Sequence, residues 1–527
     1  MAVAERRAWP VRPIGSPQAG GFKQVFIGLD FGTTFTKVSY RVTPALWWNV
    51  KSMKFFGEED PHLFPSVVWL GPDDKNSPRI QYLEPCDPES NMVPVKYFKY
   101  SMVLPGLVQP PLVGSMIRST KNGLRIVSAF FLGNLLKDIR DTIVRDEKLA
   151  PDAIQWFVNL GIPAGTSGPH AKFRPEVSDH EVVEVFSEVL NVAWKFSNTH
   201  FALDGEMSLA ELDRFYDESK HERDYTHLNC IPELYAEVLL YYQDKNVPEG
   251  FYCVVDVGGG TVDVAVFYKE FVEGNTEVSC VAHAVAPLGF ESLLERVALP
   301  PVDEPRRNAI ASLPIPYDVL GHFGRMKDTP DIMPDKFDGA VHQFELAFGK
   351  HCLDAVRLEL PTLVRKETIN RHDFSLFLLG GGRGVQFYRD VIGHMSNALE
   401  AAGFPGKREC DILDYVREIN RFAVVDNSRL LISQMLAQPF NEIPKLDGSI
   451  WRMSQRTNRD LPLLFDIQSR VPIKLGMRVR HCLDGAGTIV SIDGIDGRFD
   501  VDCDNGKSFR YSNPAAFETR TITLFGE

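Results

Sequence analysis

The sequence predicts an α/β protein made of two related halves, followed by a small unit of β-strands. An apolar strand that ends in an aspartate and a glycine turn occurs at residues 25–38 and again at 253–267. Such a repeat indicates two halves that share a topology and face one ligand. Residues 473–512 instead alternate short strand-like runs with Asp-Gly and Asn-Gly turns, which predicts a separate all-β unit.

Composition excludes several classes of protein. Of the 527 residues, 44% are hydrophobic and 24% charged, as in ordinary globular chains with ample material for a core. The net charge of −13 argues against nucleic-acid binding, which needs a basic face. Eight cysteines show no CxxC pair or zinc spacing, which fits a reducing compartment. No apolar run approaches the ~20 residues of a membrane span and no secretory signal is visible, so we expect a cytoplasmic protein without a membrane partner.

The most informative stretch is residues 253–267, CVVDVGGGTVDVAVF. Valines at period two flank a glycine turn, which predicts a hairpin. One glycine would suffice for that turn, so the run Gly258–Gly260 leaves bare backbone N–H groups that a large anion can approach. Asp256 and Asp263 bracket the turn, and carboxylates beside a phosphate need a cation such as hydrated Mg²⁺ between them. Taken alone, the stretch fits a phosphate loop and an ordinary glycine-rich hairpin equally well.

Residues 25–38, VFIGLDFGTTFTKV, contain a second copy of this pattern. A strand runs to Asp30, Gly32 makes the turn, and Thr33 and Thr34 follow. The copy shifts the interpretation towards phosphate binding, because hydroxyls and amides of two hairpins can clamp a triphosphate from both sides.

Two shorter stretches extend the pattern. Residues 374–388, FSLFLLGGGRGVQFY, predict a strand, a glycine turn and a helix, which lets a helix N-terminus approach a nucleotide. Residues 288–292, LGFES, follow the second hairpin closely. A dinucleotide-binding fold is excluded because no G-x-G-x-x-G separates an early strand from a helix, and a Walker loop is absent.

These four stretches together resemble the nucleotide-binding motifs of the actin, hexokinase and heat-shock protein 70 superfamily. Their sequences are most similar to those of heat-shock protein 70. The resemblance covers roughly residues 22–440. It implies a two-lobed actin-like ATPase fold with duplicated ribonuclease-H-like halves. ATP or ADP with Mg²⁺ would bind between the lobes, and the reaction would be hydrolysis of ATP to ADP and phosphate.

The resemblance also implies roles for individual residues. Asp30, Asp256 and Asp263 would hold the water shell of Mg²⁺, and Asp256 would orient or deprotonate the attacking water. A family lysine that reaches the γ-phosphate matches Lys99 or Lys96, although a solvated lysine on an edge strand is the alternative for both. The residues expected to contact the nucleotide are Gly32, Thr33, Thr34, Gly258, Gly259, Gly260, Thr261, Glu291, Gly380, Gly381, Gly382 and Arg383.

Three positions depart from the family pattern. A glutamate-proline pair that holds the magnesium-water network is reversed here, so Glu233 is either a weaker candidate for that role or an acid at a helix N-terminus. The family's adenine-stacking arginine lies two residues after its glycines, whereas Arg383 follows Gly382 directly. At residues 422–438 bulkier residues replace a glycine-alanine-alanine helix, so the nucleotide geometry or the lobe packing differs.

We expect a disordered tail at residues 1–21, a first ATPase lobe at 22–230 and a second lobe at 231–440. A proline-rich linker at 441–471, a small barrel at 472–514 and a C-terminal tail at 515–527 follow. In the first lobe we expect a helix over 125–147, a strand over 154–165, a helix over 181–196, and a charged surface insertion with solvated histidines over 197–229.

The barrel segment is similar to Tudor or SH3-like barrels. Its strands are predicted at Met477–His481, Gly487–Ile492, Arg498–Cys503 and Ser508–Tyr511, around Val479, Ile489, Val490 and Phe499. Its charge is nearly balanced, which favours recruitment of a protein partner over DNA.

The resemblance implies a nucleotide-driven conformational switch that a protein partner reads. Only about ninety residues follow position 440, too few for the sandwich and lid of a heat-shock protein 70 chaperone, so we expect no usual substrate-binding domain. Three alternatives stay open: a filament-forming actin-like protein, a small-molecule kinase of the superfamily, and a non-hydrolysing nucleotide-binding scaffold.

Overall fold

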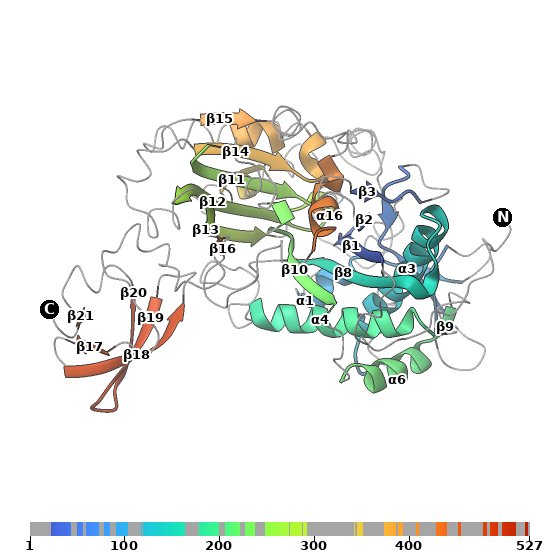
Figure 1. Cartoon of the computed structure of the whole chain (residues 1–527), viewed down its shortest axis with the longest axis horizontal. Helices are drawn as coiled ribbons and strands as arrows, with labels where there is room; N and C mark the ends of the chain where they lie inside the picture. Colours follow the sequence, from blue (N-terminus) through green and yellow to red (C-terminus); the bar gives the residue numbers. More distant parts are fainter. Residues whose placement is uncertain are drawn as a thin grey trace.

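The structure of the chain, a computed structural model, is a mixed α/β protein, and the described residues form four β-sheets (Figure 1). This confirms the mixed α/β class. The structure describes residues 23–43, 50–55, 60–72, 78–84, 91–103, 117, 120–163, 179–199, 206–221, 227–234, 236–237, 248–272, 275–286, 288–291, 293, 342, 345–350, 352, 374–385, 388–393, 407–410, 428–439, 452–454, 478–481, 485–493, 498–512 and 522–524.

The first large sheet is built on the hairpin of β1 and β2, whose apolar residues are buried on both faces. Its strand order is β10-β8-β1-β2-β3, and β4 also pairs with β2. β2 and β3 run antiparallel to their neighbours, whereas β8 and β10 add in parallel on the other side of β1. The strands are β1 (Lys23–Phe31), β2 (Phe35–Val42), β3 (Lys51–Ser52), β4 (Phe64–Pro65), β8 (Ile154–Ile162) and β10 (Leu228–Pro232).

The second large sheet has the same topology. Its order is β15-β14-β11-β12-β13-β16, with an antiparallel hairpin at β11 and β12, antiparallel β13, and parallel β14 and β15. The strands are β11 (Gly250–Val257), β12 (Val262–Val272), β13 (Asn275–Ala286), β14 (Phe374–Leu379), β15 (Lys407–Cys410) and β16 (Arg452–Ser454). The shared order confirms that the two halves repeat one topology. The edge strand β16 comes from the segment that we expect to be a linker.

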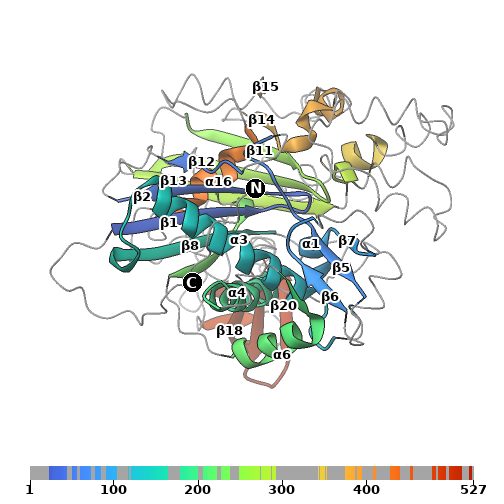
Figure 2. The ribbon, with the colours of Figure 1, turned by 90° about the vertical axis from the view of Figure 1, so that its right-hand side faces the viewer.

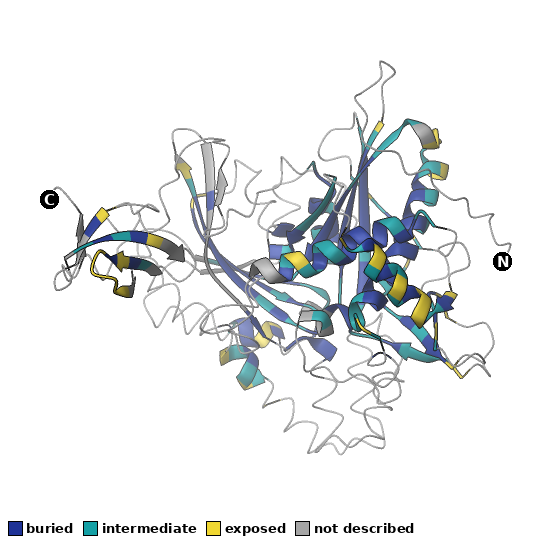
Figure 3. Ribbon diagram, turned by 90° about the horizontal axis from the view of Figure 1, so that it is seen from below, coloured by how far each residue is buried: buried dark blue, intermediate teal, exposed yellow. Residues whose placement is uncertain are grey.

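Helices and a smaller sheet complete the first half. α3 carries the predicted helix and is buried along most of its length, packing against α4 (Figures 2 and 3). The expected boundaries at 125–147 and 181–196 lie within two residues of those observed. The helices are α1 (Phe98–Val103), α3 (Leu124–Asp146), α4 (Asp179–Phe196) and α6 (Leu209–Ser219), and the sheet strands are β7 (Val93–Val95), β5 (Val68–Gly71), β6 (Arg79–Gln81) and β9 (Glu206–Ser208).

The described parts of residues 197–229 differ in part from the surface insertion that we expect: His221 is exposed as expected, His200 lies outside the described residues, and α6 and His227 are packed. A capping box between Ser208 and Glu211 starts α6, and that helix buries Leu212 and Tyr216. His227 lies edge-on to Trp194 with ring centroids 5.5 Å apart, and burial lowers its pKa to about 4. It is therefore a packed histidine and not a solvated one. The apolar residues of α6 recur at helical spacing among charged residues, so the segment looks exposed in the sequence although one face of the helix is buried.

The last helical segment of the second half lies on the first sheet. It consists of a 3₁₀ turn, η4 (Ser428–Leu430), and α16 (Leu431–Leu436). Asn159 Nδ2 of β8 donates to the carbonyl oxygens of Leu436 and Gln438 at 2.7 and 2.8 Å. A Cβ on Gly28 of β1 would overlap the Ser433 carbonyl oxygen, so glycine permits this close packing. Figure 1 shows α16 where the two large sheets meet.

The C-terminal strands form an antiparallel sheet of five strands in the order β20-β19-β18-β17-β21. Four of them coincide with predicted strands, and β21 lies in the expected tail. Val479 and Ile489 are buried as predicted, but Val490 is 41% exposed because neighbouring strand residues face opposite sides. The side chain of Phe499 lies outside the described part. The strands are β17 (Arg478–His481), β18 (Gly485–Asp493), β19 (Arg498–Cys503), β20 (Ser508–Ser512) and β21 (Ile522–Leu524).

No helix in the part of the chain that the structure describes is long and apolar enough to cross a membrane.

Candidate functional site

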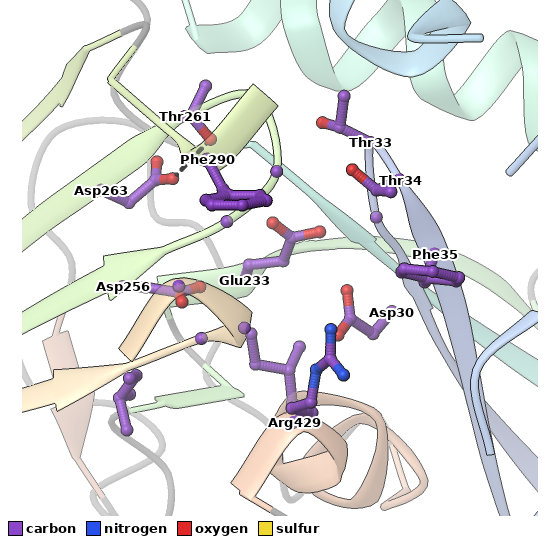
Figure 4. A pocket seen from close by; sticks show the side chains of 18 of the residues that line it. Asp30, Thr33, Thr34, Phe35, Glu233, Asp256, Thr261, Asp263, Phe290 and Arg429 are labelled. Atoms are coloured by element: carbon purple, nitrogen blue, oxygen red, sulfur yellow. Dashed lines mark hydrogen bonds between the residues drawn. The ribbon is translucent and has the colours of Figure 1, made fainter. Parts of the chain in front are cut away.

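The two hairpin turns meet at one pocket, which Figure 4 shows from close by. The turns arise at equivalent points, because β1–β2 and β11–β12 are the central hairpins of sheets with the same strand order. Most of the predicted residues line this pocket: Asp30, Gly32, Thr33, Thr34, Lys99, Asp256, Gly258, Gly259, Thr261, Asp263, Glu291, Gly380, Gly381 and Gly382.

Two predicted residues, Gly260 and Lys96, do not line the pocket, and a third, Arg383, is described only in its backbone. Gly260 does not line the pocket, and its carbonyl oxygen instead accepts from Gly289 N at 3.3 Å. The backbone of Arg383 belongs to the 3₁₀ turn η3 (Gly381–Gly384), but its side chain lies outside the described part. Lys96 is not a lining residue either. Burial lowers its pKa, and the nearby charge of Glu291 opposes that shift.

The two hairpins approach each other closely at Gly259. A Cβ on this glycine would overlap Thr34 Oγ1 of the first hairpin, so a larger residue would require Thr34 or the turns to shift. Thr34 Oγ1 also donates to Glu291 Oε1 at 3.3 Å, and the backbone N–H of Glu291 donates to the Gly259 carbonyl oxygen at 2.7 Å. The LGFES segment thus fastens the second turn against the first.

Glu291 joins the two halves through a second donor, Tyr97, which lies between β7 and α1. The Tyr97 hydroxyl donates to Glu291 Oε2 at 2.8 Å. Tyr97 has a φ of 58°, an uncommon conformation for an aromatic residue. Burial raises the pKa of Glu291, and the hydrogen bond from Tyr97 partly offsets that rise. This role of Tyr97 is not predicted from the sequence, because no local sequence pattern indicates its positive φ or its contact with a residue 194 positions away.

In the first hairpin, Asp30 forms an ion pair with Lys37. The two residues face each other across β1 and β2, and Lys37 Nζ donates to Asp30 Oδ2 at 2.8 Å. Asp30 is 3% exposed, so its charge is balanced in a buried setting. The sequence reasoning missed Lys37. Hairpin register, which pairs residues equidistant from the turn, is the signal that would have found it.

Lys99 lies in the pocket on α1 and pairs with Glu233. Its Nζ donates to Glu233 Oε1 at 2.6 Å, and the residue is 6% exposed. Lys99 is therefore not the solvated edge-strand lysine of the alternative interpretation. Glu233 opens the helical segment after β10, and burial raises its pKa while Lys99 opposes the rise. The reversed proline-glutamate order still places a glutamate beside the lysine.

The second hairpin carries two carboxylates where the first carries an ion pair. Asp256 and Asp263 face each other across β11 and β12. Burial is the largest cause that raises the pKa of Asp256 to about 6 and that of Asp263 to about 8. Nearby carboxylates add to both shifts, whereas Lys37 opposes the first and a 2.9 Å hydrogen bond from Thr261 Oγ1 opposes the second.

Glu237 adds another buried carboxyl group to this cluster. It is 3% exposed, and in its protonated form it donates to Asp256. Burial, followed by the charges of Asp256 and Asp263, raises the pKa of Glu237 well above its usual value. The sequence reasoning missed Glu237. Its spacing of four residues from Glu233 places both on one helix face, a signal that is visible in the sequence.

These residues fit a hydrated cation beside a phosphate chain. Asp256 Oδ1 is buried and has no hydrogen-bond partner among the residues that the structure describes. A Cβ on Gly380, whose φ is +79°, would overlap that oxygen, so the glycine keeps the space beside it open. Within the described part, no group of three histidine, cysteine or acidic side chains can hold a metal directly. Mg²⁺ would therefore be held through waters and phosphate oxygens, as is usual for this ion.

The chain matches no protein-family model and no curated protein.

Proposed function

We propose that the protein binds and hydrolyses ATP in a two-lobed actin-like fold, similar to heat-shock protein 70, with each large sheet as the ribonuclease-H-like core of a lobe. The observation that carries the proposal is the convergence of two topologically equivalent Asp-x-Gly hairpins on one pocket. Arrival of the LGFES segment and the Gly380–Gly382 turn at the same pocket supports it, because residues 25–38, 253–292 and 380–382 are far apart in the sequence.

In this proposal the phosphates lie between the two turns. The turns at Gly32 and Gly258–Gly259 line that space, and the hydroxyls of Thr34 and Thr261 stand beside it. The N–H groups of Gly32 and Gly258 donate to carbonyl oxygens within their own turns, those of Asp30 and Thr261, at 3.0 and 2.9 Å. Asp30, Asp256 and Asp263 would hold the water shell of Mg²⁺, which would supply positive charge beside the transferring phosphoryl group.

Hydrolysis requires a water in line with the γ-phosphorus. The bond from phosphorus to the bridging oxygen breaks as the bond to water forms, and the water proton passes to a base. Asp256 suits that role, because its Oδ1 is buried without a hydrogen-bond partner among the described residues and burial raises its pKa, which favours proton acceptance. Lys99, held by Glu233, supplies positive charge at the γ-phosphate.

The hydrolysis cycle would serve as a conformational switch. Thr34 and Tyr97 of the first half both donate to Glu291 of the second, so a phosphate that rearranges Thr34 also acts on the contact between the halves. The C-terminal sheet, as an SH3-like or Tudor-like barrel, would recruit a protein partner that reads the state. We place the protein in the cytoplasm, without a nucleic-acid or membrane partner.

Thermal melting with and without ATP and Mg²⁺ tests the proposal. A ligand at a hundredfold excess over its Kd stabilises a folded protein by about 2.7 kcal/mol, so millimolar ATP with Mg²⁺ should raise the melting temperature by several degrees. An unchanged melt would refute nucleotide binding.

A phosphate-release assay on the same samples separates the proposed ATPase from a non-hydrolysing scaffold. ATP-dependent pelleting identifies a filament, and ADP formation that requires an added sugar or carboxylic acid identifies a kinase.

A further inference from the structure

Arg429 occupies the pocket from a part of the chain that none of the four motifs includes. It belongs to η4, directly before α16, and lines the pocket together with Leu431 and Ile432. Its guanidinium lies over the ring of Phe35, with Cζ 5.8 Å from the ring centroid. A Cβ built on Gly381 would lie 3.0 Å from Arg429 Nη2. Arg429 thus stands between the first hairpin and the glycine turn of the second half.

The backbone that carries Arg429 is firmly placed. Leu430 is fully buried, and Ser433 Oγ lies within hydrogen-bonding distance, 2.9 Å, of both Ser39 Oγ and the Leu430 carbonyl oxygen. Together with the bonds from Asn159, these contacts fix η4 and α16 on the first sheet. In Figure 4 the guanidinium points into the pocket on the side of Asp30. A side chain on such a support reaches a ligand with little loss of conformational entropy.

The lining of the pocket carries more acidic than basic side chains. The carboxylates that line it are Asp30, Glu233, Asp256, Asp263 and Glu291, whereas the cations are Lys37, Lys99 and Arg429. Lys37 and Lys99 each donate to a carboxylate, at 2.8 and 2.6 Å. Because five carboxylates line the pocket against three cations, each cation on the lining lowers the repulsion that a triphosphate meets there. A guanidinium presents a planar pair of donors that matches two phosphate oxygens, which an ammonium cannot do.

We propose that Arg429 is a ligand-binding residue that donates paired hydrogen bonds to phosphate oxygens of the bound nucleotide. The inference rests on the proposed function and deepens it, because it adds a phosphate contact from a segment that none of the four motifs includes. The stacking of Arg429 on Phe35 would then couple the first hairpin to the phosphate chain.

Affinities for ATP with Mg²⁺, ADP with Mg²⁺ and adenosine test the inference in the full-length protein. The variants are Arg429→Gln and Arg429→Lys, and Arg214→Gln is the matched control because Arg214 is exposed on α6 and does not line the pocket. We expect Arg429→Gln to raise the Kd for ATP by about tenfold to a hundredfold, the usual effect of losing a charged hydrogen bond. Adenosine, which has no phosphate, should keep its Kd. Arg429→Lys should restore part of the loss, because it keeps the charge without the planar fork.

The outcomes separate the inference from the proposed function. If the unaltered protein binds neither ATP nor ADP, the proposed function fails. If it binds them and Arg429→Gln changes ATP and adenosine affinities equally or not at all, the inference is overturned and Arg429 is structural. Should Arg429→Gln not fold, Arg429→Lys decides: a weaker affinity for ATP with unchanged adenosine binding supports the inference, and equal effects overturn it.

Discussion

The two central hairpins share one backbone plan but differ in charge. At the same position opposite the first aspartate, β2 carries Lys37 whereas β12 carries Asp263. The first hairpin is therefore a neutral ion pair, and the second is a pair of carboxylates with raised pKa values. The shared topology places both turns at the pocket. The residue across from the aspartate then sets the charge of each turn: a lysine there allows an anion nearby, and a second aspartate requires a cation.

This difference predicts which side of the pocket faces the phosphates and which side faces the cation. Anionic phosphate oxygens are expected nearer the hairpin of Lys37, and the hydrated cation nearer the hairpin of Asp263. Four predictions break or sharpen the comparison.

The largest effect is expected when the aspartates that begin the two turns are changed separately. Asp256→Asn keeps the hairpin shape but removes the base and part of the water network, so ATP hydrolysis should fall by roughly a hundredfold while nucleotide binding survives in part. Asp30→Asn should reduce turnover less, because Lys37 remains to balance phosphate charge. Single-turnover phosphate release measures both. Wild-type turnover in Asp256→Asn would show that Asp256 is only a hairpin residue.

The next effect concerns the close approach of the turns. Gly259→Ala places a methyl group on Thr34 Oγ1, whereas Gly258→Ala meets only ordinary to tight contacts at 3.3 Å from the Thr261 carbonyl oxygen. Overpacking of this kind costs about 1–3 kcal/mol. We expect Gly259→Ala to lower the melting temperature of the ligand-free protein and to abolish stabilisation by ATP, whereas Gly258→Ala should leave the ligand-free melting temperature unchanged. Equal behaviour of the two variants would mean that the hairpins do not meet there in solution.

The third prediction uses the charge of the second hairpin. The pKa of Asp263 is raised to about 8, so the folded protein holds a proton that the unfolded chain has released above about pH 4. Stability of the ligand-free protein should therefore fall as pH rises from about 4 to 8, by at most about 1.4 kcal/mol per pH unit for this group. Asp263→Asn cannot ionise and should make that decline shallower. Chemical denaturation at pH 6 and pH 8 compares the two proteins, and a steeper decline in the variant would contradict the assignment.

The smallest effect should come from the contact between the halves. Tyr97→Phe removes the donor to Glu291 and should cost about 1 kcal/mol in stability. Tyr252→Phe is the control, because its hydroxyl donates to the Pro248 carbonyl oxygen within the second half. If Tyr97 couples the halves, its variant alone should also weaken stabilisation by ATP. A loss of ATP stabilisation of the same size in both variants would remove that role.

The sequence by itself determined the features that depend on neighbours along the chain. Alternating valines and adjacent glycines predict the hairpin at residues 253–267, and amphipathic spacing predicts α3 and α4. Both predictions succeed because strands and helices have a characteristic spacing of apolar residues along the chain. The same spacing in residues 209–219 was hidden by charged neighbours, so α6 was missed. Local patterns also gave most of the glycines and aspartates of the pocket.

Only the tertiary structure decided which distant residues meet those motifs. Glu237 faces Asp256, Tyr97 reaches Glu291, and Arg429 enters the pocket because α16 folds back onto the first sheet. Gly260 turns away from the pocket for the same kind of reason, since its carbonyl oxygen binds Gly289. Such contacts depend on how whole sheets and helices pack and not on spacing along the chain. Burial by that packing also set the raised pKa values, which no sequence pattern records.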